Sequence, residues 1–395
     1  MNKVRLGDYA DQIRGVSYKP QDLHATLNKN SMILLRANNI NDDRLNFDNV
    51  VFVDRHKVNS NQYLREGDIV VCGSSGSKKL VGKAGQAAHF FSNVTFGAFC
   101  KVVRPKNIVA RYLGHYFFSS QYRKTISELS EGANINNIRN SDINELMLPL
   151  PDEASQQRIA AVLDKAQALI AARREQITVL DKLVKSQFVE MFGDPVTNPM
   201  GWEVKRLNEI STTRLGKMLD AKQQTGEHSY PYLANFNVQW FRLNLEKLNR
   251  MDFDEADRIE FALQYGDLLV CEGGEVGRTA IWKNELPDCF FQKAIHRVRC
   301  NPDCCIPEYL GWVMFFKATM TQFDGIVTGV TIAHLTGEKL KSLKIQIPPL
   351  DLQTRFADFV RQADKSKFAL KKSLAELEAL YKSLAERAFS GKLFG

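Results

Sequence analysis

The stretch LPLPDEASQQRIAAVLDKAQALIAARREQITVLDKLVKSQF, residues 148–188, decides the fold of this chain. After Pro151 the chain continues for some 40 residues, to Phe192, without a glycine or a proline, and a second such run extends from Pro349 to Phe389. Proline removes a hydrogen bond from a helix interior and glycine weakens the helix, so long runs without either residue are typical of helices. The sequence therefore predicts two long α-helices, one in the middle of the chain and one near its end.

Each predicted helix carries an apolar seam whose positions alternate in steps of four and three residues. In the first helix eight of the ten seam positions are apolar, and in the second only Lys367 is not. We expect the seams to pair within the molecule as an antiparallel coiled coil about 50 Å long, with one globular domain at each end. The alternative is that each helix packs on its own globular domain. The seam positions are Ile159, Leu163, Ala166, Ile170, Arg173, Ile177, Leu180, Val184, Gln187 and Met191, then Phe356, Val360, Ala363, Lys367, Leu370, Leu374, Leu377, Tyr381, Leu384 and Ala388.

The whole chain repeats with an offset of about 197 residues. GDIVVC at residues 67–72 corresponds to GDLLVC at 266–271, and RYLGHYF at 111–117 corresponds to EYLGWVM at 308–314. Few gaps separate the two copies, which indicates one ancestral unit that is present twice. The two helical seams are in register with this repeat.

The repeat predicts four segments. Residues 1–150 and 194–347 contain short β-branched and aromatic runs, bounded by turn residues and mixed with shorter helices, and each is expected to be a globular domain. Residues 151–193 and 348–395 are expected to be the two long helices. The predicted fold class is α+β: two pseudo-repeated domains, each with a mixed or antiparallel sheet plus helices, separated by two long antiparallel helices.

Composition excludes several classes of protein. The chain has 395 residues and 44.8 kDa, with 44% hydrophobic and 25% charged residues, which excludes collagen-like, disordered and disulfide-scaffold classes. No window approaches the roughly 18 consecutive apolar residues of a spanning helix, and the first residues lack the apolar core of a signal peptide. We expect no membrane partner and a cytoplasmic location. Seven unevenly placed cysteines make a disulfide framework improbable.

The charge is unevenly distributed. The formal net charge is +8 and the pI is near 9.0, which favours a polyanionic partner. Residues 1–150 carry +7, whereas residues 194–347 carry −2. Two similar domains that differ this much are expected if each recognises its own DNA sequence.

Motifs for catalysis are missing or incomplete. The loop GSSGSKKLVGKAG at residues 73–85 fails as a phosphate-binding P-loop, because five residues separate Gly76 from Gly82 and Ala84 follows Lys83. The cysteines between 300 and 305 lack the usual spacing of zinc ligands, so buried reduced thiols are the better interpretation and a zinc site is the alternative. No histidine pair, serine elbow or dinucleotide fingerprint is present. We expect no catalytic residue, no metal site and no cofactor in this chain.

Two equivalent loops are candidates for DNA recognition. LLRANNIND at residues 34–42 and YLANFNVQWFRLN at residues 232–244 interleave arginine, asparagine and glutamine with aromatic residues. Arginine pairs with guanine and asparagine or glutamine with adenine, whereas the alternative is that these asparagines only form turns. The glycine-rich loops at 73–85 and 272–278 share a polar sequence followed by a basic residue, and they suit contacts with DNA phosphates.

The residues resemble the specificity subunits of type I restriction-modification systems over essentially the whole chain. The resemblance rests on the order and doubling of GDIVVCGSSGSKKLVGKAG and GDLLVCEGGEVGRTAIW, of MFGDPVTNPMGWEVKRLNEI, of the two helix sequences, and of the terminal AFSGKL. It implies a non-catalytic subunit that recognises an asymmetric bipartite DNA target. Each recognition domain would bind one half-site, and the helices would set the spacer.

The resemblance also implies partners. These are double-stranded DNA, two modification subunits that methylate adenine, and two ATP-dependent restriction subunits. The alternatives are a structural or protein-interaction scaffold without DNA specificity, and an enzyme with a cryptic zinc or nucleotide site. The positional candidates for DNA contact are Arg36, Asn38, Asn39, Ser74, Ser75, Ser77, Lys78, Lys79, Lys83 and Asn134 in the first domain, and Arg214, Lys217, Asn235, Asn237, Gln239, Glu275, Arg278, Thr331 and His334 in the second.

Overall fold

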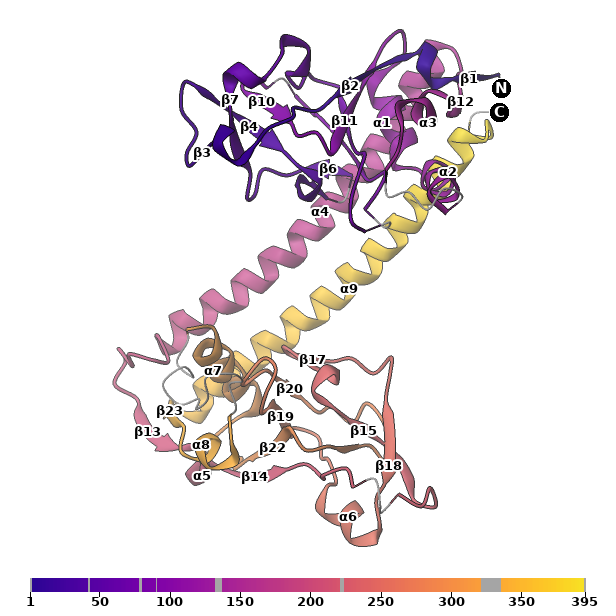
Figure 1. The fold of residues 1–395 in the computed structure, drawn as a ribbon. Coiled ribbons are helices and arrows are strands. Elements are labelled where there is room, and N and C mark those ends of the chain that lie inside the picture. Colours follow the sequence, from indigo (N-terminus) through magenta and orange to yellow (C-terminus); the bar gives the residue numbers. More distant parts are fainter. Residues whose placement is uncertain are drawn as a thin grey trace. The chain divides into compact units, whose positions relative to one another are not determined.

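The computed structural model describes residues 2–41, 43–77, 80–89, 91–131, 137–220, 224–320 and 335–393 (Figure 1). It divides into two compact units. Unit 1 comprises Met1–Glu175 together with Lys371–Gly395, and unit 2 comprises Gln176–Leu370. Each unit contains one globular head, which we call head 1 (residues 2–150) and head 2 (residues 194–347). Each unit also takes in about half of both long helices.

In its described residues, head 1 is built from two sheets, a short strand pair and three α-helices. The larger sheet has the order β2 (Ala10–Arg14), β11 (Cys100–Pro105), β8 (Ile69–Cys72), β9 (Ala84–Gln86), β6 (Arg44–Leu45) and β5 (Ile40–Asn41). The second has the order β10 (Val94–Phe96), β4 (Ser31–Leu35), β7 (Val51–Asp54) and β3 (Leu23–His24). The pair joins β1 (Lys3–Arg5) to β12 (Met147–Pro149), and the helices are α1 (Ala110–Phe118), α2 (Ser120–Glu131) and α3 (Asn140–Asn144).

Head 2 repeats the order of the central strands of both sheets. Its larger sheet has the order β14 (Ser211–Leu215), β22 (Ile295–Cys300), β19 (Leu268–Cys271) and β20 (Thr279–Ile281). The second sheet has the order β18 (Asn249–Asp252), β15 (Ser229–Leu233) and β21 (Phe290–Phe291). Two strand pairs join β13 (Glu203–Arg206) to β23 (Lys344–Ile347) and β16 (Val238–Gln239) to β17 (Arg242–Leu243). The helices are α5 (Leu207–Ile210), α6 (Glu255–Glu260), α7 (Pro307–Thr319) and α8 (Gly337–Lys341).

The register of the central strands confirms the repeat. Ile69 lies opposite Val103 in head 1, and Leu268 lies opposite Val298 in head 2, in antiparallel pairs. A parallel pair recurs in both heads, between β4 and β10 and between β15 and β21, and head 1 also pairs β6 with β9 in parallel. The predicted α+β class with two pseudo-repeated mixed-sheet domains is therefore confirmed.

A buried ion pair also recurs in the two heads. The fully buried carboxylate of Asp68 accepts a hydrogen bond from Arg104 at 2.7 Å, and that of Asp267 accepts one from Arg299 at 2.7 Å. In each head the same carboxylate also accepts a backbone N–H three residues earlier, again at 2.7 Å. The heads therefore share this buried ion pair as well as the order of their central strands.

The two long helices are α4 (Glu153–Phe192) and α9 (Leu350–Phe389), each of 40 residues. All predicted seam positions are buried or half-buried. In unit 1, Gln167 of α4 donates to Tyr381 of α9 at 3.3 Å, while Arg174, further along α4, pairs with the earlier Glu378 at 2.8 Å. The two helices therefore run antiparallel within unit 1.

In unit 2 the other halves of the same helices meet. Lys367 of α9 pairs with Asp181 of α4 at 3.1 Å, and the rings of Phe356 and Phe188 are 5.4 Å apart. As the position along α4 increases, the partner on α9 again lies earlier in the chain. The antiparallel arrangement therefore holds within unit 2 as well.

The ends of the long helices complete the core of each head. In unit 1, Leu163 of α4 and Phe389 of α9 belong to the cluster that contains Tyr112 and Tyr116 of α1. In unit 2 the corresponding positions are filled by Phe188 and Phe192 of α4 and by Phe356 of α9. Because every buried aromatic ring removes a large apolar area from water, these contacts attach each head firmly to its helices. Both expectations for the helices therefore apply: they pair with each other, and their ends pack on the heads.

Candidate nucleic-acid interface

A surface depression of about 640 Å³ on head 1 brings together side chains from loops that are far apart in the sequence. Four predicted contact residues line it: Arg36 and Asn38 from the loop after β4, and Ser74 and Ser75 from the loop after β8. We call this feature the head 1 depression. The other lining residues are Ser17, Tyr18, Ala37, Gly76, Gly97, Ala98, Phe99 and Cys100.

The turn after β4 is held by Asn39. Its side chain is fully buried, where its Oδ1 accepts the Arg36 backbone N–H at 2.9 Å and its Nδ2 donates to the Asp48 carbonyl at 2.9 Å. Asn39 therefore forms the turn, and it does not face the surface as a base contact would require. The turn places Asn38 on the surface and half-buries Arg36.

The guanidinium of Arg36 is incompletely paired. One Nη donates to the Asn49 carbonyl at 3.0 Å, which fixes the direction of the side chain along the wall of the depression. Its buried Nε has no hydrogen-bond partner among the described residues. Because an unpaired buried donor costs free energy, a bound acceptor at this wall would be stabilised.

Phe99 is the most prominent apolar side chain of the depression, with 70% of its surface exposed. Its backbone is nevertheless tightly held, because its carbonyl accepts the N–H groups of Gly73 at 2.8 Å and Ser74 at 3.1 Å. A rigid turn therefore presents an aromatic ring beside Arg36 and the two serines. Phe99 is not among the residues predicted from the sequence, because a single aromatic residue in a loop has no periodicity to mark it.

The basic residue after each glycine-rich loop points inward. Lys83 donates to the Ile40 carbonyl at 3.0 Å and to Asn41 Oδ1 at 3.2 Å. Arg278 donates to the Asn235 carbonyl at 2.8 Å. The sequence predicts that these basic side chains are exposed at the end of the loop. Instead, each one connects the glycine-rich loop of its head to the neighbouring turn by hydrogen bonds. Hydrogen bonding to the protein's own carbonyls explains why these side chains do not extend into solvent.

Head 2 uses the same turn with different surface residues. Asn237 is fully buried, accepts the Ala234 N–H at 2.9 Å and donates to the Asn244 and Lys247 carbonyls at 2.8 Å, as Asn39 does in head 1. Asn235 is half-buried and donates to the Gly273 carbonyl at 3.2 Å. Asn237 therefore has the turn-forming role that was the alternative to base contact.

Head 2 exposes apolar side chains in the loops that correspond to those of the head 1 depression. Met218, after β14, is 61% exposed, Leu219 beside it in the sequence is exposed to a lesser degree, and Phe236 is exposed after β15. Gln239 donates to the Phe236 carbonyl at 2.9 Å, and Glu275 accepts the indole N–H of Trp240. The two heads thus present different chemistry on one scaffold.

Two segments of the chain, residues 1–180 and 199–379, match the family model of the type I restriction modification DNA specificity domain. The chain belongs to this family. It is 29% identical over 405 residues to the type I restriction enzyme EcoKI specificity subunit of Escherichia coli (strain K12), across 96% of this chain and 86% of that protein. It is 26% identical over 409 residues to the StySPI specificity subunit of Salmonella potsdam, with the same shares of each chain.

Solved structures share the fold of this specificity-domain chain. One, from work on complex assembly and conformational transition of the type I R-M system, has a TM-score of 0.59 at 16% identity and covers 99% of this chain and 98% of its own. The S subunit from M. genitalium has a TM-score of 0.54 at 16% identity, with 98% and 96% covered. Each match to the family model contains one head and most of the long helix that follows it. The specificity domain is therefore the repeat unit itself.

Two further candidates in the second specificity domain have partners within head 2. Arg214 forms an ion pair with Glu260, and Lys217 forms one with Asp257 and donates to the Asp252 carbonyl at 2.7 Å. The half-buried Lys217 ammonium also lies 5.1 Å from the ring centre of Phe253. These contacts connect the end of β14 and the residue after Gly216 to β18 and α6. Ser77 is exposed in the loop after β8, and Lys78, Lys79, Asn134, Thr331 and His334 lie outside the described residues.

The thiols show no sign of reactivity. Cys72, Cys100, Cys271, Cys289 and Cys305 are buried, and all seven cysteines are free. Burial raises the pKa of Cys100 and Cys289 to about 12 and that of Cys271 to about 11. Within the described ranges no group of three or more histidine, cysteine or acidic side chains could hold a metal ion. No helix in the same ranges is long and apolar enough to cross a membrane.

Proposed function

We propose that this chain is the DNA-recognition subunit of a type I restriction-modification enzyme and that it binds an asymmetric bipartite duplex target, one half-site per head. The observation that carries the proposal is the shared turn built by Asn39 and Asn237, which supports different surface residues in the two heads. One scaffold with two different surfaces is suited to two different half-sites.

In head 1 the contact surface is the head 1 depression. Arg36 and Asn38 supply donors and acceptors of the kind that pair with base edges, and Ser74 and Ser75 supply hydroxyl groups for phosphates or bases. Tyr18 and Phe99 add aromatic surface for sugar, methyl or base contacts. In head 2 the corresponding surface includes Met218, Leu219 and Phe236, so shape and apolar contact have a larger share there.

The chain acts without a catalytic centre of its own. Two modification subunits methylate adenine in the target, and two restriction subunits use ATP to act on unmodified DNA. The paired halves of α4 and α9 in each unit connect the heads and set the spacer between half-sites. The resemblance of the whole chain and the match to the specificity domain support this assignment.

The test is sequencing of methylated positions in DNA treated with the purified chain and its modification subunit. The expected result is methylation confined to one bipartite sequence with a fixed gap. Methylation without sequence preference would refute the proposal. A scaffold without DNA specificity would instead give binding that competitor DNA of any sequence removes equally.

A further inference from the structure

The junction between head 1 and its helices contains an ion pair. Arg111, in the first turn of α1, donates its Nε to Asp164 Oδ1 of α4 at 3.0 Å, and an Nη of the same guanidinium contacts the same carboxylate. A second Nη donates to Gln86 at 2.5 Å, so the guanidinium is fixed in place. The cation of this junction is therefore on the head, and the anion is on the long helix.

The junction of unit 2 has the same geometry and the opposite polarity. Arg361 of α9 donates its Nε to Glu308 Oε1 of α7 at 3.0 Å. Adding the repeat offset of 197 to Arg111 and Asp164 gives Glu308 and Arg361. Here the anion is on the head and the cation is on the helix.

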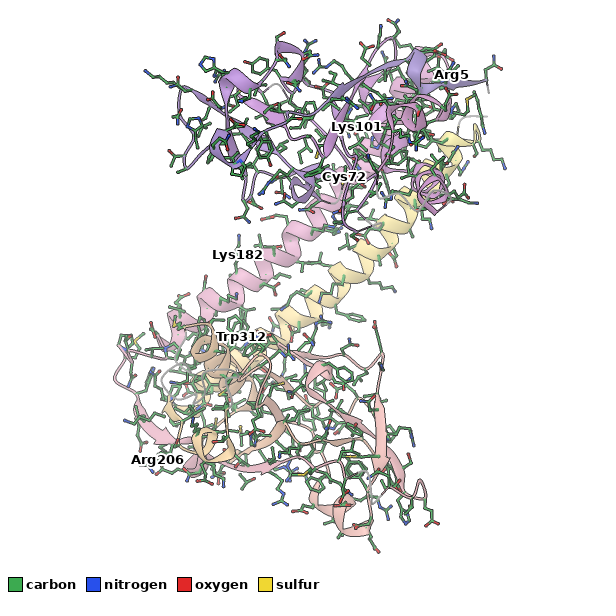
Figure 2. The ribbon with its side chains drawn as sticks, viewed as in Figure 1. Arg5, Cys72, Lys101, Lys182, Arg206 and Trp312 are labelled. Carbon is green, nitrogen blue, oxygen red and sulfur yellow. The ribbon has the colours of Figure 1, made fainter. Side chains whose placement is uncertain are left out.

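The two residues beside each ion pair also differ between the units, and both positions change from polar to less polar side chains in unit 2. In unit 1 the fully buried His115 contacts Asp164 at 2.9 Å and Tyr381 at 3.0 Å. In unit 2 the equivalent of His115 is Trp312, labelled in Figure 2, which is 5% exposed, and the equivalent of Tyr381 is Val184. Trp312 and Val184 line a cavity of about 340 Å³ in unit 2. Beside the ion pair, unit 1 therefore has a hydrogen-bonded imidazole, whereas unit 2 has an indole and an aliphatic side chain at the equivalent positions.

The buried ion pairs inside the heads do not show this inversion. The ion pairs inside the heads, Asp68 with Arg104 and Asp267 with Arg299, keep one polarity in both copies of the repeat. The polarity of this internal pair is therefore the same in both copies of the repeat, whereas both members of the junction pair differ in sign. A change in only one member would have placed two like charges in contact.

We propose that the reversed ion pair assigns each head to its own position on the long helices. If head 1 occupied the position of head 2, Arg111 would face Arg361, and His115 would face Val184 without a hydrogen-bond partner. If head 2 occupied the position of head 1, Glu308 would face Asp164. Like charges in contact and a buried unpaired imidazole both cost free energy, so each head fits its own helix better than the other. This inference concerns assembly of the chain and does not depend on DNA recognition.

A charge-reversal cycle in the full chain tests the pairing. Glu308→Arg and Arg361→Asp should each lower the midpoint of thermal unfolding by about 2–4 °C, and the double variant, which copies the polarity of unit 1, should recover most of that loss. Arg5→Glu is the control, because Arg5 pairs with Glu145 on the exposed surface and its replacement should have little effect. A double variant as unstable as the sum of the single variants would overturn the proposal.

A chain with two copies of head 1 tests the assignment itself. In this chimera, residues 1–150 replace residues 194–347. With unaltered long helices, the chimera should be less stable than the same chimera whose helices carry Arg361→Asp and Val184→Tyr. Arg361→Ala is the control, since it removes the repulsion without supplying a partner, and it should recover less stability than the matched substitutions. Equal stability of the unaltered and matched chains would refute the assignment. A chain that neither set of substitutions improves would refute it too.

Discussion

His115 of head 1 and Tyr381 of α9 are joined by a 3.0 Å contact although 266 positions separate them in the sequence. The other ring nitrogen of His115 lies 2.9 Å from Asp164 of α4. A carboxylate can only accept, so Nε2 donates to Asp164 and Nδ1 accepts from the tyrosine hydroxyl. One neutral imidazole therefore links the head to both long helices.

A decrease in pH should destabilise unit 1 because of His115. Burial lowers the pKa of His115 below its ordinary value of 6.5, even though the hydrogen bond to Asp164 acts in the opposite direction. Below pH 6.5 the unfolded chain then binds more protons than the folded chain, so the free energy of unfolding falls as the pH decreases through this range. Burial disfavours the charged form of Asp164, but hydrogen bonds from His115 and Arg111 outweigh it and lower its pKa to about 2, so Asp164 stays ionised in this window.

Thermal unfolding between pH 7.5 and pH 5.5 measures this effect. The midpoint should fall less steeply in His115→Gln than in the unaltered protein. His296 of head 2, a second buried histidine with a lowered pKa, is present in both proteins and cancels in the comparison. Identical pH dependence of the two proteins would contradict the prediction.

Phe389→Ala should destabilise head 1, although the residue lies near the end of the chain. Its ring is 2% exposed and lies 5.3 Å from the ring of Tyr112 and 5.5 Å from that of Tyr116. Removal of a buried phenylalanine side chain costs about 3–5 kcal/mol. Chemical denaturation measures the loss, and protease cleavage should begin in head 1. Phe368→Ala, at a site on the same helix that is 74% exposed, is the matched control and should leave stability nearly unchanged.

Arg36→Ala should weaken recognition of one half-site. Loss of an arginine contact with a base costs about 1–3 kcal/mol, which corresponds to binding that is about 5 to 150 times weaker. Phe99→Ala should act in the same direction on the same half-site. Binding is measured with the modification subunit present, on DNA with either half-site scrambled. Lys106→Ala, beyond the far end of β11, is the control, and an equal effect of all three variants would argue against the head 1 depression as the contact surface.

Exchange of residues 1–145 for the equivalent segment of a relative should change one half-site only. The two heads have separate sheets and separate cores, so the contact surface of head 2 is unaffected by the exchange. Methylation sequencing of the chimera identifies the altered positions. A change in both half-sites would refute the modular arrangement.

Insertion of one helical turn in the long helices should widen the spacer of the target. Four residues added after Glu175 and four added after Leu370 lengthen both helices by about 6 Å, close to two base-pair steps of duplex DNA. The inserted residues should continue the steps of the seam so that the helices stay paired. An unchanged spacer in methylation sequencing would show that the helices do not set it.

The sequence predicted the parts of the fold that depend on local pattern. The absence of glycine and proline located α4 and α9, and every position of the apolar seam is buried or half-buried. The repeat located both heads, because a duplicated chain keeps its strand order. What the pattern did not show is that Phe389 belongs to the core of head 1, since that contact joins residues at opposite ends of the chain.

The candidate site was predicted less completely, because residue type does not fix side-chain direction. Arg36 and Asn38 lie on the surface depression as expected, but Asn39 turns inward to satisfy backbone groups that the tight turn leaves unpaired. Lys83 turns inward for the same reason. Phe99 was missed, and only its position in a rigid turn beside the two serines marks it as part of the surface.

Unit 1 is made of two separate segments of the chain, so it can be completed only after unit 2 during synthesis. Unit 2 is one continuous segment, Gln176–Leu370, so all of its residues are present once the ribosome has passed that point. Unit 1 needs Lys371–Gly395 to cover a core whose other residues were made first. At about 5–20 residues per second, head 1 waits roughly 10 to 50 seconds for the last turns of α9. Head 1, the first to leave the ribosome, is the last to be finished, and its uncovered apolar face is the part of the nascent chain that a chaperone would bind.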